Sequence, residues 1–321
     1  MARRCAKRVS LRGSALFKLT SPARLAHILC ISPGQLAYLV RNAEANYLVR
    51  TDRKTGRLIE EPKALLKQVH ARVAKLLQQI ETPDYLHSGV RQRSYVTNAS
   101  QHGAKDSAVK LDIKKFFPSV RAAAVYSFFH ELMEYPADVA SRMTRLLTIG
   151  GHLPTGGNAS CILSFWAYKP MFDEIAELAV AKSCAFTLYV DDMTISGRFA
   201  SRSMQQAARQ IVGRHRLRAH KNKVFVPNQP RVVTGVAVTV RGLELPNRRA
   251  KAIDDATQVV THTADGSAKL ALLPVLIGRV SEAAEIDPAW NGRKTAAVNL
   301  RRTLTGRIAT ASRPGGGEPP A

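Results

Sequence analysis

The sequence has 321 residues, of which 45% are hydrophobic, and it carries 48 Lys and Arg against 24 Asp and Glu, a formal net charge of +24. This length allows a sizeable core in about two domains, and so large a positive surplus indicates a polyanionic partner, nucleic acid first. No apolar run approaches the length needed to cross a bilayer, so we expect no membrane-spanning helix. The cysteines at 5, 30, 161 and 184 have neither metal-ligand spacing nor the pattern of a disulfide framework, so we expect reduced thiols in a cytoplasmic protein with no membrane partner.

The N-terminal part is expected to hold a basic arm, helices and one β-hairpin. Residues 1–30 are rich in Arg and contain no acidic residue, which favours a basic arm and helix for nucleic acid over an organelle presequence, the alternative interpretation. Apolar spacing over 22–48 is helical, and Ser32 followed by a proline predicts a helix start. Two short apolar strands flank a Lys-Thr-Gly turn in residues 47–62, which predicts a hairpin, and a helical stripe follows over 63–80.

Two later strands are expected to carry carboxylates. In residues 108–120 hydrophobic and polar residues alternate, which places Asp112 on the polar face of a strand. The stretch CAFTLYVDDMTISG, residues 184–197, alternates up to Asp191 and Asp192, and a hairpin turn there would bring both carboxylates to one edge. The remaining pattern predicts helices over 121–149, a glycine loop at 151–160, an apolar helix at 161–181, a basic helix at 203–218, strands at 223–226 and 232–240, and helices from about 245 to 310.

Three carboxylates would crowd one spot if Asp112 lies on a strand next to this hairpin. Unpaired carboxylates that close together repel one another, and a hard divalent cation with oxygen ligands, such as Mg²⁺, relieves the repulsion. Two Mg²⁺ ions, with Mn²⁺ as the alternative metal, can activate a hydroxyl and steady a leaving pyrophosphate, which is the chemistry of nucleotidyl transfer. Taken singly, these residues also fit a solvated turn and a surface strand, so the order of further motifs decides between the interpretations.

Eight motifs in sequence order resemble those of bacterial retron reverse transcriptases, and they extend from about residue 44 to 310. They are KTGRLIEEPK (54–63), NASQH (98–102), LDIKKFFPSV (111–120), LPTGGNAS (153–160), YVDDMTIS (189–196), HKNKV (220–224), VTGVAV (233–238) and LIGRVSEAAEIDP (276–288). The Asn-Ala-x-x-His and Val-Thr-Gly motifs favour the retron lineage over other bacterial reverse transcriptases.

The resemblance implies an α+β fold, a right-hand polymerase with fingers, a palm built of an antiparallel sheet plus helices, and a helical thumb. The expected boundaries are a basic N-terminal arm and helix at 1–30, fingers at 31–107 with a contribution from 125–160, a palm with the catalytic Asp residues at 108–244, a helical thumb at 245–311 and a disordered tail at 312–321.

The resemblance also assigns roles to individual residues. The expected catalytic residues and metal ligands are Asp112, Asp191 and Asp192. The residues expected around the nucleotide are Arg57, Phe117, Thr155, Gly156 and Lys223, with Lys221 as the rival of Lys223. The residues expected at the primer and RNA are Tyr189, Asn98, His102, Thr234 and Gly235. Among these, Phe117 would exclude ribonucleotides through a clash with the 2′-hydroxyl, and Arg57 would grip the triphosphate.

Ordinary structural roles remain open for several of these residues. Phe117 could be a core aromatic, Tyr189 could serve strand packing, and His102 could be a buried, hydrogen-bonded histidine. The glycine loop departs from the family pattern, because Gly157-Asn158-Ala159 stands where a small, Pro-rich stretch is usual and Thr155 replaces a commoner Gln. The contact of this loop with the nucleotide and template base is therefore open.

The implied function is RNA-templated DNA synthesis from deoxynucleoside triphosphates in a bacterial cytoplasm. A cognate structured non-coding RNA would supply primer and template, and one of its 2′-hydroxyls would start the DNA, giving branched RNA–DNA (msDNA) for antiphage defence beside a neighbouring effector protein. Residues 198–251 contain thirteen Lys and Arg and one acid, Glu244, which suits an RNA–DNA hybrid. The alternatives are a reverse transcriptase of another bacterial lineage with a different primer, and a catalytically inactive basic RNA-binding protein.

Overall fold

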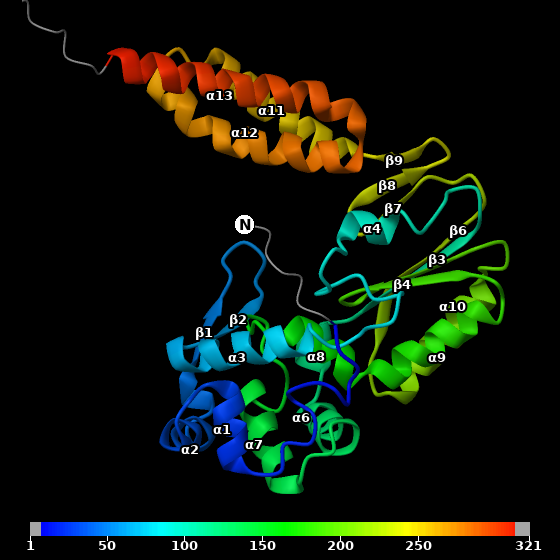
Figure 1. The fold of residues 1–321 in the computed structure, drawn as a ribbon. Coiled ribbons are helices and arrows are strands. Elements are labelled where there is room, and N and C mark those ends of the chain that lie inside the picture. Colours follow the sequence, from blue (N-terminus) through cyan, green and yellow to red (C-terminus); the bar gives the residue numbers. More distant parts are fainter. Residues whose placement is uncertain (1–7, 312–321) are drawn as a thin grey trace, which may run out of the picture. The chain divides into compact units, whose positions relative to one another are not determined.

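The computed structural model describes residues 8–311, which form two compact units (Figure 1). The first unit comprises residues 8–102 and 106–227, and the second comprises 103–105 and 228–311. The first seven residues of the expected basic arm and the whole expected tail at 312–321 lie outside the described residues. The helices and antiparallel sheets confirm the α+β class.

Helices and one hairpin form the N-terminal part of the first unit. The Ser32 side chain accepts a hydrogen bond from the Gln35 N–H in a capping box, so the predicted helix start is confirmed. The predicted hairpin is also confirmed, with Tyr47 opposite Pro62 in an antiparallel register. The elements are α1 (Pro22–Leu29), α2 (Pro33–Arg41), β1 (Tyr47–Thr51), β2 (Leu58–Pro62), α3 (Ala64–Leu77) and α4 (Tyr95–Ala99).

The helices between the two carboxylate strands are shorter than the sequence pattern predicted. The expected single helix at 161–181 breaks at Tyr168, because Pro170 has no N–H to continue the helical hydrogen bonds and lies in the first turn of a new helix. The expected helical stretch at 121–149 is likewise divided. The elements are α5 (Phe116–Ser119), α6 (Ala122–Ser127), a π-helical turn (Phe128–Leu132), α7 (Ala137–Leu147), α8 (Ser160–Ala167) and α9 (Lys169–Val180).

A four-stranded antiparallel sheet follows, in the order β4-β5-β3-β6. Helices α9 and α10 (Arg202–Arg214) cover one face of this sheet (Figure 1). Val109, Leu111 and Ile113 are buried on that face, whereas Lys110 and Asp112 lie on the other, as the alternation predicted. The elements are β3 (Ala108–Ile113), β4 (Ala185–Tyr189), β5 (Asp192–Ser196), α10 (Arg202–Arg214) and β6 (Ala219–Phe225).

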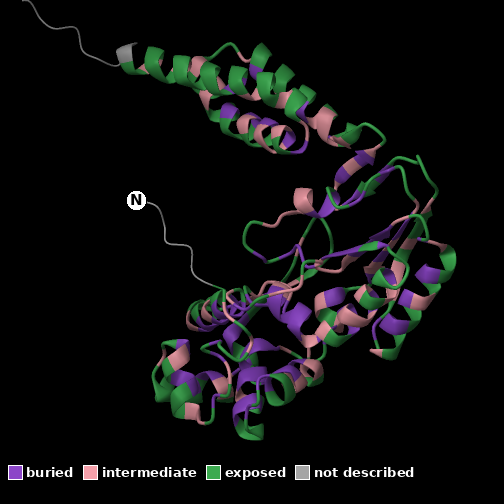
Figure 2. Cartoon of the chain, turned by 45° about the vertical axis from the view of Figure 1, so that its right-hand side comes forward, coloured by how far each residue is buried: buried purple, intermediate pink, exposed green. Residues whose placement is uncertain are grey.

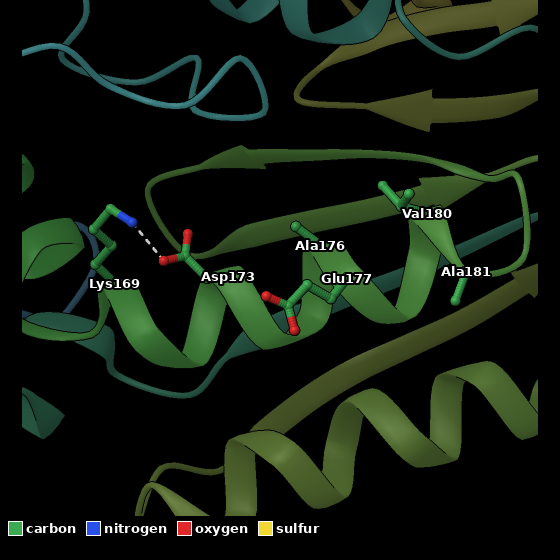
Figure 3. A pocket seen from close by; sticks show the side chains of 6 residues that line it. All are labelled: Lys169, Asp173, Ala176, Glu177, Val180 and Ala181. Carbon is green, nitrogen blue, oxygen red and sulfur yellow. Dashed lines mark hydrogen bonds and ion pairs between the residues drawn. The ribbon is translucent and has the colours of Figure 1, made fainter.

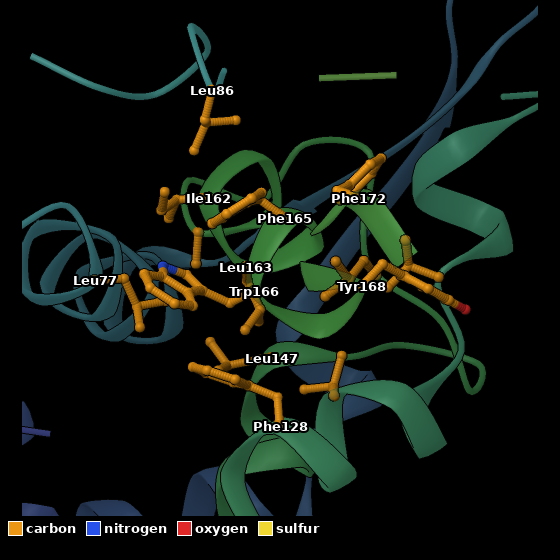
Figure 4. Close-up of a cluster of buried hydrophobic side chains, with 14 of the residues drawn as sticks. Leu77, Leu86, Phe128, Leu147, Ile162, Leu163, Phe165, Trp166, Tyr168 and Phe172 are labelled. Carbon is orange, nitrogen blue, oxygen red and sulfur yellow. The ribbon is translucent and has the colours of Figure 1, made fainter. Parts of the chain in front are cut away.

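The core of the first unit surrounds α8. This helix is apolar on nearly every side, so it is buried rather than amphipathic. Figure 4 shows its Ile162, Leu163, Phe165 and Trp166 among side chains from several other helices. Buried residues, purple in Figure 2, lie on α8 and on the sides of the surrounding helices that face the core. A rigid core next to the sheet gives the strand ends fixed positions.

The second unit contains a small sheet and three helices. The expected strand at 232–240 is in fact two strands, because Thr234 and Gly235 adopt φ values of 45° and 81° and form a tight reverse turn between them. The elements are β7 (Arg231–Val233), β8 (Val236–Thr239), β9 (Gly242–Glu244), α11 (Asn247–His262), α12 (Gly266–Ile286) and α13 (Asn291–Ala311). The division of the chain after Pro227 falls inside the expected palm, and the finger, palm and thumb boundaries stay predictions. Over residues 8–311 we find no helix with the length and apolarity to cross a membrane.

Candidate active site

Three carboxylates meet where the hairpin β4–β5 lies beside β3. Asp112 on β3 is directly opposite Asp192 at the start of β5, and Tyr189 on β4 is opposite Asp192 from the other side. Asp191 lies in the two-residue turn, and its carbonyl accepts a hydrogen bond from the Ile113 N–H at 3.2 Å. The structure therefore places Asp112 on the strand next to the hairpin, as the sequence pattern required for a shared site.

The turn itself is strained. Val190 has a φ of 59°, in the left-handed region that a β-branched residue rarely enters. Its N–H donates a hydrogen bond to the Ser88 Oγ at 2.8 Å, which helps to hold this conformation. Strained backbone of this kind persists only where the surrounding structure enforces it, and it is concentrated at functional sites.

Two of the three carboxylates, Asp191 and Asp192, lie where burial disfavours their charged form. Burial, together with the charge of Asp112, raises the pKa of Asp191 to about 6. Burial also raises the pKa of Asp192, and the Lys110 ammonium, whose Nζ lies 3.0 Å from Asp192 Oδ2, opposes that rise. The other oxygen, Asp192 Oδ1, is buried and accepts no hydrogen bond from the described residues. A buried carboxylate oxygen without a partner is costly, so this edge suits a positively charged ligand.

The donor set fits a hard divalent cation. Carboxylate oxygens are the ligands that Mg²⁺ prefers, and one of them has no other partner. Within residues 8–311, however, His, Cys, Asp and Glu side chains do not form a complete metal-binding group of three or more. Binding of Mg²⁺ or Mn²⁺ by Asp112, Asp191 and Asp192 is therefore a proposal.

Strand β6 brings a second set of charges to Asp112. The pairing of β3 with β6 is irregular between Lys110 and Asp112, and Lys221 has a φ of 50° at this irregularity. As a result, Lys221 Nζ lies 3.4 Å from Asp112 Oδ2, and His220 Nδ1 lies 3.3 Å from Oδ1. Lys223 is opposite Lys110 in the strand register and has an exposed side chain. The structure thus brings Lys221, the rival residue, to the carboxylates.

Two partly buried aromatic residues lie close in the chain to the carboxylates. Phe117 is half-buried in the short helix that follows β3, and its ring stacks on Phe116 with centroids 5.9 Å apart. Phe116 is buried and packs edge-on against Phe172, so it belongs to the core and leaves Phe117 nearer the surface. Tyr189 is half-buried opposite Asp192. Both placements suit contacts with a nucleotide and a primer, and the roles of both residues stay predictions.

The glycine loop packs against the β1–β2 hairpin through Glu60. A Cβ at Gly156 would lie 2.8 Å from the Glu60 carbonyl oxygen, so only glycine fits this close approach. The Thr155 hydroxyl donates to the Leu58 carbonyl at 2.7 Å and accepts from the Glu60 N–H at 3.2 Å. Both residues therefore connect the loop to β2, which is a structural role beside the expected nucleotide contact. Arg57 is exposed in the loop that joins β1 to β2.

The residues expected at the RNA divide between the two units. His102 is 1% exposed and hydrogen-bonds Ser196 Oγ at 2.6 Å and Thr187 Oγ1 at 2.7 Å, which favours the structural interpretation that the sequence left open. Asn98 is fully buried in α4. Thr234 and Gly235 form the turn between β7 and β8 in the second unit, so their contribution to RNA binding stays a prediction.

Several hollows of the first unit lie at residues other than those expected in the site. One of about 510 Å³ runs along α9, where Lys169 and Asp173 form an ion pair (Figure 3). Another, of about 580 Å³, is lined by Arg41, Arg145 and neighbouring residues. Neither hollow is lined by Asp112, Asp191 or Asp192, so we assign no ligand to them.

Sequence reasoning missed four residues that shape the site. Ser88 contacts the hairpin turn, and Lys110 forms an ion pair with Asp192. His220 lies beside Asp112, and Glu60 accepts a hydrogen bond from the glycine loop. Lys110 and His220 could have been found, since both lie within two residues of an expected site residue. Ser88 and Glu60 gave no signal, because their partners are about 100 residues away in the sequence.

A family profile described as Reverse transcriptase (RNA-dependent DNA polymerase) matches residues 49–238, more than half of the chain and the part that carries all three carboxylates. The chain belongs to this reverse transcriptase family. The retron Se72 reverse transcriptase of Salmonella heidelberg is 30% identical over 181 residues, which cover 54% of this chain and 47% of the relative. The retron Ec86 reverse transcriptase of Escherichia coli is 24% identical over 237 residues, 70% of this chain and 72% of the relative.

These matches confirm the expected resemblance to retron reverse transcriptases, although this chain spans about half the length of the Salmonella relative. Among solved structures, telomerase from Candida albicans in complex with a fragment of telomeric RNA is similar with a TM-score of 0.44 at 11% identity, covering 80% of this chain and 61% of that one. A TM-score of this size is too low to support a statement about any element of this chain.

Proposed function

We propose that the chain is an RNA-directed DNA polymerase whose catalytic residues are Asp112, Asp191 and Asp192. The observation that carries the proposal is the direct pairing of Asp112 with Asp192, with Asp191 in the adjoining turn, in a chain of the reverse transcriptase family. In the reaction, the oxygen of a primer hydroxyl forms a bond to the α-phosphorus of a deoxynucleoside triphosphate. The bond to pyrophosphate breaks, and the hydroxyl proton leaves to a base or to water.

Asp112, Asp191 and Asp192 would hold Mg²⁺, with Mn²⁺ as the alternative. When bound, two such ions supply charge that lowers the pKa of the primer hydroxyl and stabilises the leaving pyrophosphate. The unpartnered Asp192 Oδ1 and the raised pKa of Asp191 support this assignment, because a cation would offset both costs. The residues of the chain hold the carboxylates in place: Lys110 orients Asp192, and Lys221 and His220 orient Asp112.

The nucleotide site is proposed to lie around Phe117. Phe117 would select deoxynucleotides, and Lys221 is better placed than Lys223 to approach the phosphates, because it already lies beside Asp112. Arg57 would contact the triphosphate from the β1–β2 loop, where its side chain is exposed. Tyr189 would contact the primer end beside Asp192.

The retron resemblance suggests the source of primer and template. We propose that a structured non-coding RNA encoded beside the gene supplies both, that one of its 2′-hydroxyls starts the DNA, and that the branched product serves antiphage defence with a neighbouring effector protein. The relatives named as retron reverse transcriptases and the Asn-Ala-x-x-His and Val-Thr-Gly motifs support this. The basic stretch at 198–251 suits the phosphates of an RNA–DNA hybrid.

Two extension assays test the proposal. In the first, the purified full chain receives an oligo(dT) primer on poly(rA), Mg²⁺ and labelled dTTP, and we expect extension that stops when the metal is chelated. Replacement of dTTP by UTP should give little product, and Phe117→Ala should raise the use of UTP. Absence of extension by the wild-type chain with either Mg²⁺ or Mn²⁺ would favour the inactive RNA-binding alternative.

The second assay tests the retron assignment separately. The non-coding RNA encoded beside the gene replaces the external primer and template, and we expect a DNA product that remains covalently attached to RNA after denaturation. Treatment with a debranching enzyme should release the DNA. Extension of the external primer without any product on the neighbouring RNA would favour a reverse transcriptase of another lineage.

A further inference from the structure

A segment that no sequence motif identified runs beside the edge strand of the sheet. Residues 83–88, called the strap below, lie next to β4, with Leu86 bridged to Leu188 in parallel. The His87 N–H donates to the Leu188 carbonyl at 2.9 Å, and the Leu188 N–H donates to the Tyr85 carbonyl at 2.7 Å. The strap therefore satisfies backbone groups of the strand that leads into the turn at Val190 and Asp191.

Two side-chain contacts anchor the first part of the strap. The Tyr85 hydroxyl donates to Asp173 Oδ1 at 2.6 Å, on the helix α9 that Figure 3 shows. The Arg93 guanidinium donates to the carbonyls of Pro83 and Leu86, each at 2.7 Å. Because one anchor is Asp173 on the distant helix α9 and the other is Arg93 in the loop that follows, the strap presents a rigid edge to the hairpin.

Ser88 ends the strap and connects it to the turn. The residue is 3% exposed, and its Oγ accepts the Val190 N–H at 2.8 Å. The half-buried Cys161 thiol lies beside the same hydroxyl, whose hydrogen bond opposes the rise that desolvation causes in the thiol pKa. Loss of the hydroxyl would leave the Val190 N–H without this partner and would weaken the support for its left-handed conformation.

We propose that Ser88 is a positioning residue for the nucleotidyl-transfer centre, which holds Val190 at positive φ and thereby fixes the direction of the Asp191 carboxylate. The consequence for catalysis rests on the proposed function, whereas the effect on the turn does not. A carboxylate that points in a changed direction stabilises the transition state less, while the triphosphate and primer still bind through other residues. Loss of the Ser88 hydroxyl therefore lowers kcat and leaves KM for the nucleotide nearly unchanged.

The test compares Ser88→Ala, Ser88→Thr and the control Ser100→Ala, an exposed serine near the end of α4. With oligo(dT) on poly(rA), we expect Ser88→Ala to lower kcat about tenfold with KM for dTTP within about twofold, and Ser88→Thr, which keeps the hydroxyl, to retain most of the activity. Ser100→Ala should match wild type, and the thermal unfolding of all three variants should show a folded protein. Should Ser88→Ala fail to fold, Ser88→Cys, with a weaker acceptor of similar size, takes its place.

A kcat for Ser88→Ala within about twofold of wild type, or an equal loss in Ser88→Thr, would overturn the proposal. A readout independent of catalysis separates it from the proposed function: exchange of the Val190 amide hydrogen, measured by NMR on the full chain, should be about tenfold faster in Ser88→Ala than in Ser100→Ala. If wild type shows no extension but the amide exchanges as expected, the polymerase assignment fails and the support of the turn by Ser88 stands. Unchanged exchange overturns the positioning role whatever the activity.

Discussion

The two ends of the β4–β5 hairpin carry polar side chains on the same face of the sheet, but they differ in how well these groups are satisfied. Away from the turn, the buried His102 pairs the hydroxyls of Thr187 and Ser196, although the buried Thr194 hydroxyl opposite Thr187 accepts no hydrogen bond from the described residues. At the turn, Val190 is strained, Asp192 Oδ1 is buried without a hydrogen bond from the described residues, and burial raises the pKa of Asp191. The unpartnered group at the turn is a carboxylate oxygen, whose cost a cationic ligand can offset.

This difference separates structural from functional polar residues on one hairpin. A buried network whose members are satisfied stabilises and rigidifies the fold. A buried group that lacks a partner destabilises the free protein, so its presence is explained when a cation or substrate completes it. The comparison therefore predicts that substitutions at the turn change activity most, whereas substitutions at His102 change stability most.

The largest effect is expected at the turn. Asp191→Asn removes one charge from the proposed metal site, and we expect kcat for primer extension to fall by about a thousandfold or more. The control is Asp138→Asn on α7, where the carboxylate lies 4.0 Å from Arg142 Nε, and it should leave kcat unchanged. Retention of more than about a tenth of the wild-type kcat by Asp191→Asn would remove this residue from the active centre.

The next effect is expected away from the turn, at His102. His102→Ala creates a cavity and leaves the hydroxyls of Thr187 and Ser196 without this partner, so the free energy of unfolding should fall by about 2–4 kcal/mol in urea denaturation. RNA affinity of the fraction that remains folded should match wild type. Unchanged stability together with weaker RNA binding would instead assign His102 to the RNA contact that the sequence motif suggested.

A smaller effect distinguishes the two lysines of β6. Lys221 lies 3.4 Å from Asp112, whereas Lys223 is opposite Lys110 in the register. We expect Lys221→Ala to lower kcat about tenfold and Lys223→Ala to stay within about twofold of wild type in the same extension assay. The opposite order would restore Lys223 as the residue that approaches the triphosphate.

The smallest effect concerns stability without metal. Because the pKa of Asp191 is raised in the folded state to about 6 from an unfolded value of 3.8, its ionisation destabilises the fold above pH 6, and this cost disappears as the pH falls toward 3.8. After discounting for partial exposure, Asp191→Asn should raise the free energy of unfolding by about 1 kcal/mol at about pH 8 in a chelator. The gain should vanish near about pH 4. A destabilised Asp191→Asn protein at the higher pH would contradict the raised pKa.

Much of the local structure could be predicted from the sequence. The alternation in 108–120 predicted which side of β3 is polar, and Ser32 predicted the start of α2. The break at Tyr168 and the turn at Thr234 were missed, because the apolar pattern continues through both and the local proline and Val-Thr-Gly signals were not used to divide the elements. Lys221 and Lys223 could not be ranked, since a strand irregularity decides which of them reaches Asp112.

The sequence by itself determined the chemical character of this protein: its basic charge, its motif order and the two adjacent aspartates that follow an alternating strand. Tertiary structure decided which groups these residues meet. Three features join segments between 80 and 102 positions apart: the pairing of Asp112 with Asp192, the hydrogen bonds of the buried His102, and the support of Val190 by Ser88. Such contacts depend on packing and strand register, which are properties of the folded chain as a whole and leave no periodic signal in the segments themselves.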